Sequence, residues 1–270
     1  GNGAIVNSAS PIKVLKGLYP GATFLGDNLN NPITAISAGR YHSLALADNG
    51  RVFSFGLNTF GQLGDGTLTQ QTTPVIVLKG LYAGTTNLGD NIANPIVSIA
   101  SGWYHSISLA ADGSVYTFGY NVDGELGDNT NVNKTTPIRV LKGAYGGTTF
   151  LGDKLNNPIV MIGAGEGHNI ATDAKGFLYT FGWNPYGQLG NNSLVSRNIP
   201  VIVGGVGNVG NLNVLENYEA PIVRTVPANR ITYTGATLNA LVNASVLPTT
   251  VSFEYGLTTS YGNIVNVPGV

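Results

Sequence analysis

The chain has 270 residues, a formal net charge of −1, only 10% charged residues and no cysteine. A chain of this length holds one or two domains, and without cysteine it can form neither disulfides nor thiolate zinc sites. The near-neutral charge offers no basic patch or tail, so we expect no nucleic-acid partner. No run of 18 apolar residues occurs, and we therefore expect no insertion into a membrane.

The most informative feature is an internal repeat with a period of 63 residues. The stretch Gly39–Gly64 returns at Gly102–Gly127 and again at Gly165–Gly190. A fixed period indicates a repeat architecture. A glycine and a histidine recur in each copy, and we interpret them as structural positions: Gly39, His42, Gly102, His105, Gly165 and His168.

The first residues fall in the middle of a unit, because Gly1–Ala4 aligns with Gly64–Thr67. We therefore expect the chain to be a piece of a longer protein. A Gly- and Asn-rich insert follows within residues 11–36 and recurs at 77–95 and 140–158. We expect this insert to be an ordered excursion that lengthens a hairpin on one rim.

Each unit then predicts three or four short antiparallel strands. In the first unit the candidate strands are 33–37, 42–47, 52–56 and 74–78, and large and small side chains alternate with period two in the second of them. Asn49-Gly50 and its counterpart Asp112-Gly113 predict a two-residue hairpin turn between the middle strands. No segment has a sustained 3.6-residue period.

These residues resemble a known repeat family. The pattern Gly-x-x-His-Ser-Leu-Ala-Leu, followed by Asn-Gly-x-Val-Phe-x-Phe-Gly-x-Asn-x-x-Gly-Gln-Leu-Gly, is similar to the repeat of the regulator of chromosome condensation (RCC1) family. The resemblance implies an all-β fold, a partial β-propeller of about three blades, over residues 1–205. Since three blades do not close a ring, we also expect self-association through open blade faces.

A different pattern follows the repeats. Residues 206–219 are rich in Gly and Asn, which predicts a linker. Residues 220–270 alternate again and resemble the first half of a bacterial fibronectin type III-like module. About 100 residues make a complete sandwich of this type, so we expect an incomplete one here.

Candidate chemistry is sparse. Three repeated histidines could bind zinc, but the family resemblance favours a buried turn hydrogen bond within each blade. Asp65 and Asp128, replaced by Asn191 in the third copy, are better explained as turn residues than as an acid–base pair. Gly205–Gly210 matches a dinucleotide fingerprint without the helix that this function requires. We expect no catalytic residue, no metal and no cofactor.

Loop positions that differ between copies predict a binding rim. Aromatic and arginine side chains on loops are the usual anchors of binding surfaces; ordinary drift of loops after duplication is the alternative explanation. The candidate rim residues are Arg40, Tyr41, Trp103, Tyr104, Glu166, Tyr120, Trp183 and Tyr186.

The sequence therefore predicts a non-enzymatic scaffold for protein binding or adhesion. The fibronectin-like pattern and the lack of cysteine favour a bacterial surface or secreted protein, with a protein or cell-surface ligand. A guanine-nucleotide exchange factor for a small GTPase, which the family resemblance suggests, is the first alternative. An accessory region of a large secreted enzyme and an inhibitor that caps other proteins are further alternatives.

Overall fold

The computed structural model describes residues 1–205, 210–214, 222–232, 235–243, 251–255 and 263–267, and within these ranges the chain is all-β. The chain divides into two compact units, Gly1–Asn213 and Val214–Val270. In the part of the chain that the structure describes, no helix is long and apolar enough to cross a membrane.

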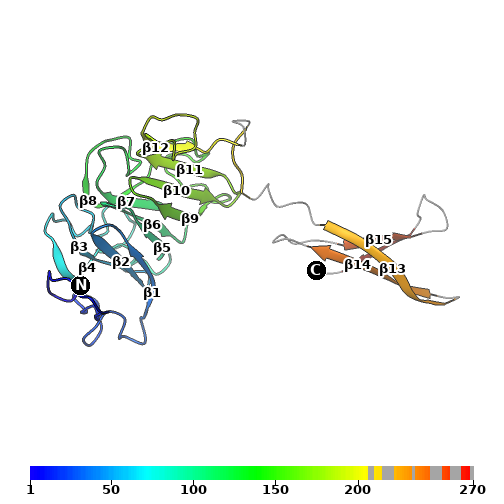
Figure 1. Cartoon of the computed structure of the whole chain (residues 1–270), viewed down its shortest axis with the longest axis horizontal. Helices are drawn as coiled ribbons and strands as arrows, with labels where there is room; N and C mark the ends of the chain where they lie inside the picture. Colours follow the sequence, from blue (N-terminus) through cyan, green and yellow to red (C-terminus); the bar gives the residue numbers. More distant parts are fainter. Residues whose placement is uncertain (206–209, 215–221, 233–234, 244–250, 256–262, 268–270) are drawn as a thin grey trace. The chain divides into compact units, whose positions relative to one another are not determined.

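The first unit consists of three four-stranded antiparallel sheets that follow one another along the chain (Figure 1). Each sheet is one blade, and its strands lie side by side in sequence order. This arrangement confirms the expected partial propeller. The strands are β1 (Ile33–Ala38), β2 (His42–Ala47), β3 (Val52–Gly56) and β4 (Gln71–Ile76) in blade 1, β5 (Ile96–Ser101), β6 (His105–Ala110), β7 (Val115–Gly119) and β8 (Lys134–Arg139) in blade 2, and β9 (Ile159–Ala164), β10 (His168–Asp173), β11 (Leu178–Gly182) and β12 (Arg197–Ile202) in blade 3.

The turn between the two middle strands differs from the prediction. A two-residue type I′ turn needs positive φ at both of its central residues. Only Gly50 has it (84°), and Asn49 does not. Leu46 pairs with Val52, and the Ala47 N–H donates to the Arg51 carbonyl at 3.0 Å, which leaves a three-residue loop ending in a left-handed glycine. The expected two-residue hairpin turn is therefore wrong, and the glycine serves as the bulge residue of a longer loop.

The outermost strand begins three residues earlier than predicted, at Gln71 rather than Pro74. Proline has no N–H to give to a ladder, but an outer edge strand tolerates it. The Pro74 carbonyl accepts a hydrogen bond from the Leu18 N–H at 2.8 Å. A Cβ on Gly17, which has φ of +53°, would lie 2.0 Å from that same oxygen. The recurring proline and glycine thus fasten each insert to the outer strand of the blade that follows it.

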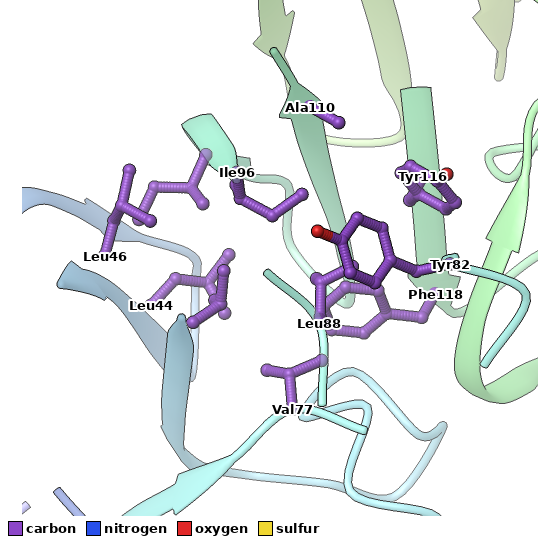
Figure 2. Packing of buried hydrophobic residues seen from close by; sticks show 11 residues of the cluster. Leu44, Leu46, Val77, Tyr82, Leu88, Ile96, Ala110, Tyr116 and Phe118 are labelled. Carbon is purple, nitrogen blue, oxygen red and sulfur yellow. The ribbon is translucent and has the colours of Figure 1, made fainter. Parts of the chain in front are cut away.

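The second and third inserts lie between blades instead of projecting from a rim. In the second insert, Tyr82 and Leu88 are buried together with Leu44 of blade 1 and Phe118 of blade 2 (Figure 2). The third insert repeats the arrangement with Tyr145 and Leu151 between blades 2 and 3. The expected excursion that lengthens a hairpin is therefore wrong, because the second and third inserts connect the last strand of one blade to the first strand of the next and contribute large apolar side chains to the core between them.

A carboxylate organises the loop of each insert. Asp90 accepts hydrogen bonds from the backbone N–H groups of Thr85, Thr86 and Asn87 at 2.8–2.9 Å, and these bonds lower its pKa to about 2, although desolvation by burial opposes them. Asp27 and Asp153 occupy the same position in the other two inserts. The recurring aspartate thus has a structural explanation.

The first unit extends to Asn213, beyond the predicted boundary at 205. The Leu212 N–H donates to the Val203 carbonyl at 2.9 Å, and Asn213 forms an antiparallel bridge with Phe177. The rest of the predicted linker, residues 206–209 and 215–219, lies outside the described residues. Residues 210–213 therefore belong to the last blade.

The second unit contains two antiparallel strand pairs. β13 (Ile222–Thr232) pairs with β14 (Gly235–Asn243), and β15 (Val251–Tyr255) pairs with β16 (Asn263–Val267). Strand pairs of this kind do not identify a fibronectin type III-like module, which stays a prediction.

Two leucines of the second insert test its role in the core. Leu88→Ala should lower the free energy of unfolding by about 2–5 kcal/mol, because Leu88 is fully buried and its removal leaves a cavity between blades 1 and 2. Leu81→Ala is the matched control, since Leu81 is 62% exposed in the same insert and only its backbone bonds to Pro137. Urea unfolding of both variants measures the difference; equal losses would contradict the buried role.

Candidate functional site

In each blade, two loops lie side by side at one end of the strands. One loop joins the first and second strands, and the other follows the third strand. Because the strands are antiparallel, both loops lie at the same end of the sheet. Backbone hydrogen bonds join the two loops: the Leu57 N–H donates to the Tyr41 carbonyl, the Tyr120 N–H to Tyr104 and the Trp183 N–H to Gly167, at 2.7–2.9 Å. The predicted rim residues lie on these loops in all three blades.

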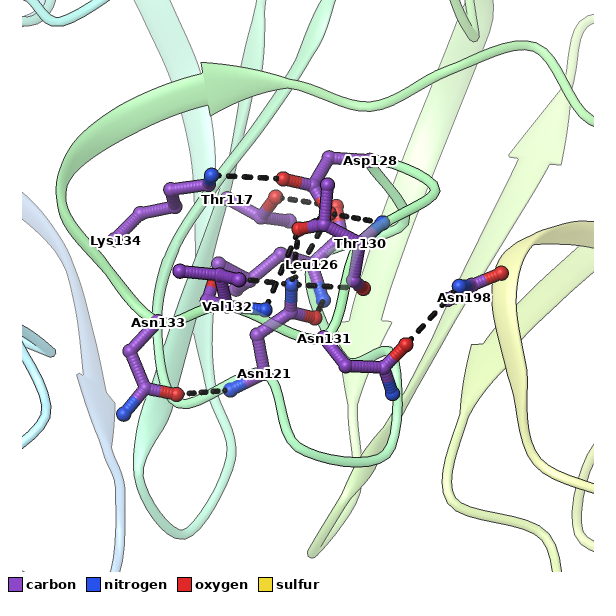
Figure 3. A network of polar contacts seen from close by, with 10 residues as sticks. All are labelled: Thr117, Asn121, Leu126, Asp128, Thr130, Asn131, Val132, Asn133, Lys134 and Asn198. Carbon is purple, nitrogen blue, oxygen red and sulfur yellow. Dashed lines mark hydrogen bonds and ion pairs between the residues drawn. The ribbon is translucent and has the colours of Figure 1, made fainter.

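A buried asparagine holds the longer loop in shape. In blade 2, the Asn121 side-chain oxygen accepts the Leu126 N–H at 2.8 Å, and its amide donates to Asp128 and to the Thr130 and Val132 carbonyls (Figure 3). Asp128 also forms an ion pair with Lys134 at 3.3 Å. Asn58 and Asn184 repeat this arrangement in blades 1 and 3. The loops that carry the candidate site are therefore internally hydrogen-bonded.

The same loop is tied to the next blade. The Asn129 N–H donates to the Asn198 carbonyl at 2.8 Å, and the Asn198 amide donates to the Asn131 side chain at 3.1 Å (Figure 3). In blade 1, the Gly66 N–H donates to Thr135 of blade 2 in the same way. These bonds fix the spacing of the loops across blade boundaries.

The repeated histidines join neighbouring blades. His42 Nε2 lies 3.0 Å from Ser106 Oγ of blade 2, and that hydroxyl donates to the Gln62 carbonyl of the blade 1 loop. Since the Ser106 proton goes to Gln62, His42 Nε2 is the donor in the first bond. The prediction of a turn hydrogen bond within each blade is therefore wrong for the His42 side chain, because its hydrogen-bond partner lies on the next blade.

His105 makes the equivalent connection one blade further along. Its Nε2 lies 3.1 Å from Asn169 Oδ1 of blade 3, and the Asn169 amide donates to the Glu125 carbonyl. Burial lowers the pKa of both His42 and His105 to about 4, so both imidazoles are neutral near pH 7. Gly39, Gly102 and Gly165 pack against the adjacent histidine rings, where a Cβ would lie 2.1–2.5 Å from the ring.

No group of three or more His, Cys, Asp or Glu side chains in the described part of the chain is arranged to hold a metal ion. Asp65 accepts hydrogen bonds from the Thr67 N–H and from the Asn58 amide, at 3.0 Å each, which is the expected turn role. The dinucleotide-like stretch falls largely on residues 206–209, outside the described residues.

Aromatic rings contact one another on the joined loops, in one group on blades 1 and 2 and in a pair on blade 3. The Tyr41 and Tyr104 ring centroids are 5.7 Å apart, and Phe60 makes edge contacts with Tyr104 at 5.2 Å and with Tyr120 at 4.9 Å. These separations are those of favourable aromatic pairs. We call the set the aromatic surface: Arg40, Tyr41, Phe60, Trp103, Tyr104, Tyr120, Trp183 and Tyr186.

Arg40 and Tyr186 lie at the ends of the aromatic surface. The Arg40 guanidinium lies 4.0 Å from the Trp103 ring centroid and 5.2 Å from that of Tyr41. The Tyr186 ring contacts Trp183 edge-on at 5.4 Å, and Tyr186 is 82% exposed. The structure therefore brings seven of the eight predicted rim residues into this surface, and the eighth, Glu166, lines the pocket beside it.

A pocket of about 310 Å³ opens within the aromatic surface. It lies at the meeting point of loops from all three blades, and its described lining holds three acidic residues and no lysine or arginine. The lining residues are Phe60, Trp103, Tyr104, His105, Tyr120, Asp123, Glu125, Glu166, Gly167 and Trp183.

Glu125 is the pocket residue that the sequence reading missed. It is 2% exposed, and its Oε2 accepts the Asp123 N–H at 2.9 Å. Gln62 and Gln188 occupy the corresponding places in blades 1 and 3 and accept the same type of bond at 2.9 and 3.0 Å. Burial raises the pKa of Glu125 to about 7. The signal that could have revealed it is the single change from Gln to Glu within the repeated Gly-Gln-Leu-Gly.

Comparison with known families agrees with the blade geometry. The family model described as "Regulator of chromosome condensation (RCC1) repeat" matches residues 49–109, 112–172 and 175–215. A second model with the same description matches residues 33–62 and 96–125. Together these segments cover more than half of the chain, and they fall on the three blades.

The curated relatives share the repeats over part of their length. Over 161 residues, the chain is 34% identical to a human protein named "Probable E3 ubiquitin-protein ligase HERC4", a match covering 60% of this chain and 13% of that protein. It is 34% identical to the zebrafish (Danio rerio) "Protein RCC2 homolog", a match covering 56% of this chain and 26% of that protein. The chain thus spans a small part of both relatives.

Among solved structures, Prp20p from Saccharomyces cerevisiae has the same fold, with a TM-score of 0.51 and 24% identity. The match covers 65% of this chain and 39% of that one, and the structure is titled for Prp20p and its binding properties to Gsp1p and histones.

One expectation is overturned by these relatives. The prediction that the protein is not an enzyme is wrong, because the repeats that match occur in a protein named as a probable ubiquitin ligase. Repeats of this kind are found within enzymes, so the absence of a catalytic motif among them does not make the whole protein a non-enzyme.

Glu125→Gln should stabilise the fold near and above pH 7. A carboxyl whose pKa is about 7 when folded and 4.5 when unfolded contributes stability below pH 4.5 and loses it as the pH rises to 7. Relative to wild type, the variant should gain up to roughly 3 kcal/mol between pH 4.5 and 7.5. Denaturant unfolding at several pH values measures the gain, with Gln62→Glu as the reverse variant. A gain that does not depend on pH would contradict the raised pKa of Glu125.

Proposed function

Because the chain belongs to the regulator of chromosome condensation (RCC1) repeat family, we propose that its first compact unit recognises partner proteins through the aromatic surface. The observation that carries this proposal is the gathering of partly exposed rings from all three blades around one pocket. Tyrosine, tryptophan and arginine are the residues that dominate the energetics of protein interfaces.

The exposure of these rings supports a binding role. Tyr41 is 49% exposed, Trp103 38% and Tyr186 82%, although each ring contacts a second ring or Arg40. Large aromatic groups left in water provide apolar area that a partner can bury. The rings are also held in place by one another, so little side-chain freedom remains to be lost on binding.

The backbone beneath the surface supports the same proposal. The loops are held by the Asn58, Asn121 and Asn184 networks and by hydrogen bonds to the next blade. A prearranged surface binds without paying for loop ordering. The recognition surface is therefore built on a rigid base.

Several expectations about the biological setting stay predictions. These are the extracellular or cell-surface location, the bacterial origin, the absence of a nucleic-acid partner and the self-association of open blade faces. The proposed recognition of a protein partner depends on none of them.

The proposal is tested by a double substitution, Tyr41→Ala with Tyr186→Ala. Both side chains are well exposed, so the fold should be retained, while affinity for a partner should fall at least about tenfold. Proteins retained by the immobilised chain from an extract of the source cells would be quantified by mass spectrometry and then measured singly. Leu155→Ala is the control, because Leu155 is 94% exposed on the insert at the opposite edge of the blade. Partners that the double variant and the control retain equally would refute the proposal.

A second candidate function is the regulation of a small GTPase by promoting nucleotide exchange. Family membership supports it, because the resemblance of the repeats implied this activity. The test is the release rate of a fluorescent guanine nucleotide from a panel of small GTPases. Acceleration that is lost in the Tyr41/Tyr186 variant would identify the partner class, and no acceleration with any member would dismiss this candidate.

A further inference from the structure

The pocket in the aromatic surface combines two features that suit one kind of ligand. Its walls include the rings of Trp103 and Trp183, and its acidic groups are Asp123, Glu125 and Glu166. Aromatic faces and carboxylates both attract cations. Its described lining contains no lysine or arginine, so these carboxyl groups have no cationic partner inside the pocket.

The acidic groups come from two blades, and they differ in burial. Asp123 and Glu125 lie on the long loop of blade 2, and Glu166 lies on the short loop of blade 3. The Glu125 side chain is only 2% exposed, whereas Glu166 is exposed at the mouth of the pocket. The pocket therefore offers a cation both an exposed carboxylate and a buried carboxyl.

Resting on the proposed protein-binding function, we propose that this pocket takes an arginine side chain of the partner. The protein itself shows that a guanidinium suits these rings, because Arg40 already lies 4.0 Å from the centroid of Trp103. A planar guanidinium can stack on a ring and donate to carboxylates in the same plane, which an ammonium group cannot. The volume of about 310 Å³ admits a side chain of this size.

An apolar anchor suits the pocket less well. It would cover the carboxyl groups of Asp123 and Glu166, which are not fully buried, without replacing the hydrogen bonds that water gives them. The raised pKa of Glu125 points the same way, since a carboxyl that resists ionisation because it is buried gains from a nearby cation. The middle blade alone carries this carboxyl; the other two have Gln62 and Gln188.

The chain provides its own reporter for the test. It has two tryptophans, Trp103 and Trp183, and both line this pocket. The probe is N-acetyl-arginine amide, and N-acetyl-citrulline amide is its neutral analogue of nearly the same shape. We expect the arginine probe to change the tryptophan fluorescence with a millimolar dissociation constant, and citrulline to bind at least about fivefold more weakly.

Two variants locate the binding. Glu166→Gln should weaken the arginine probe about threefold to tenfold, because it removes the exposed carboxylate and keeps the size of the side chain. Asp48→Asn, an exposed substitution on the turn of blade 1, should leave binding unchanged. Calorimetric titration provides a second readout for the same probes.

Equal binding of arginine and citrulline, tighter binding of N-acetyl-lysine amide, or no signal by either method would each overturn the assignment. If the arginine probe fails while the Tyr41/Tyr186 variant still loses its partner, the pocket assignment falls and the proposed function stands. If the probe binds as expected while partners ignore the aromatic surface, the pocket is a cation site and the proposed function falls.

Discussion

Each blade of this protein depends on its neighbour for the burial of a sheet face. A four-stranded sheet has two faces to cover, and here the covering material comes from the next blade together with an insert that lies between them. Tyr82 and Leu88 belong to neither sheet, yet they lie in one buried cluster with Leu44 of blade 1 and Phe118 of blade 2 (Figure 2). The apolar contact between blades is therefore the interaction on which the rest of the first unit depends, and repeat proteins owe their stability to such nearest-neighbour terms.

The candidate site also depends on the contacts between neighbouring blades. Because His42 and His105 reach across to Ser106 and Asn169, and because the long loops of blades 1 and 2 bond to the following blade, the loops of the three blades are held at fixed spacing. Rings that are 63 residues apart in sequence, such as Tyr41 and Tyr104, then come into contact. The aromatic surface is thus a product of the packing between blades, and no single blade could form it.

Much of the fold was predictable because the repeat is strict. The strands at 42–47 and 52–56, the all-β class and the blade arrangement followed from period-two alternation and the recurrence of Gly and His. The turn type and the insert were missed for physical reasons: an Asn-Gly pair serves two kinds of loop, and a Gly- and Asn-rich segment gives little sign that its few large side chains are buried. The rim residues could be listed from their variation between copies, but no pattern indicated that they touch. Asn121 and Glu125 were overlooked because they lie within a motif whose other positions were read as turn chemistry.

Glu125 is a position where the residue found in the repeat does not serve the stability of the fold. The hydrogen bond that it accepts from Asp123 is made equally well by Gln62 and Gln188 in the other two blades, without a buried charge. A carboxyl at this place therefore adds nothing to the loop that an amide would not provide, and near pH 7 it costs stability because burial resists its ionisation. Local departures from an otherwise consistent framework are expected at functional sites. Here the departure lies in the pocket where the loops of three blades meet, so a carboxyl that costs stability near pH 7 stands where the proposed cationic group would bind.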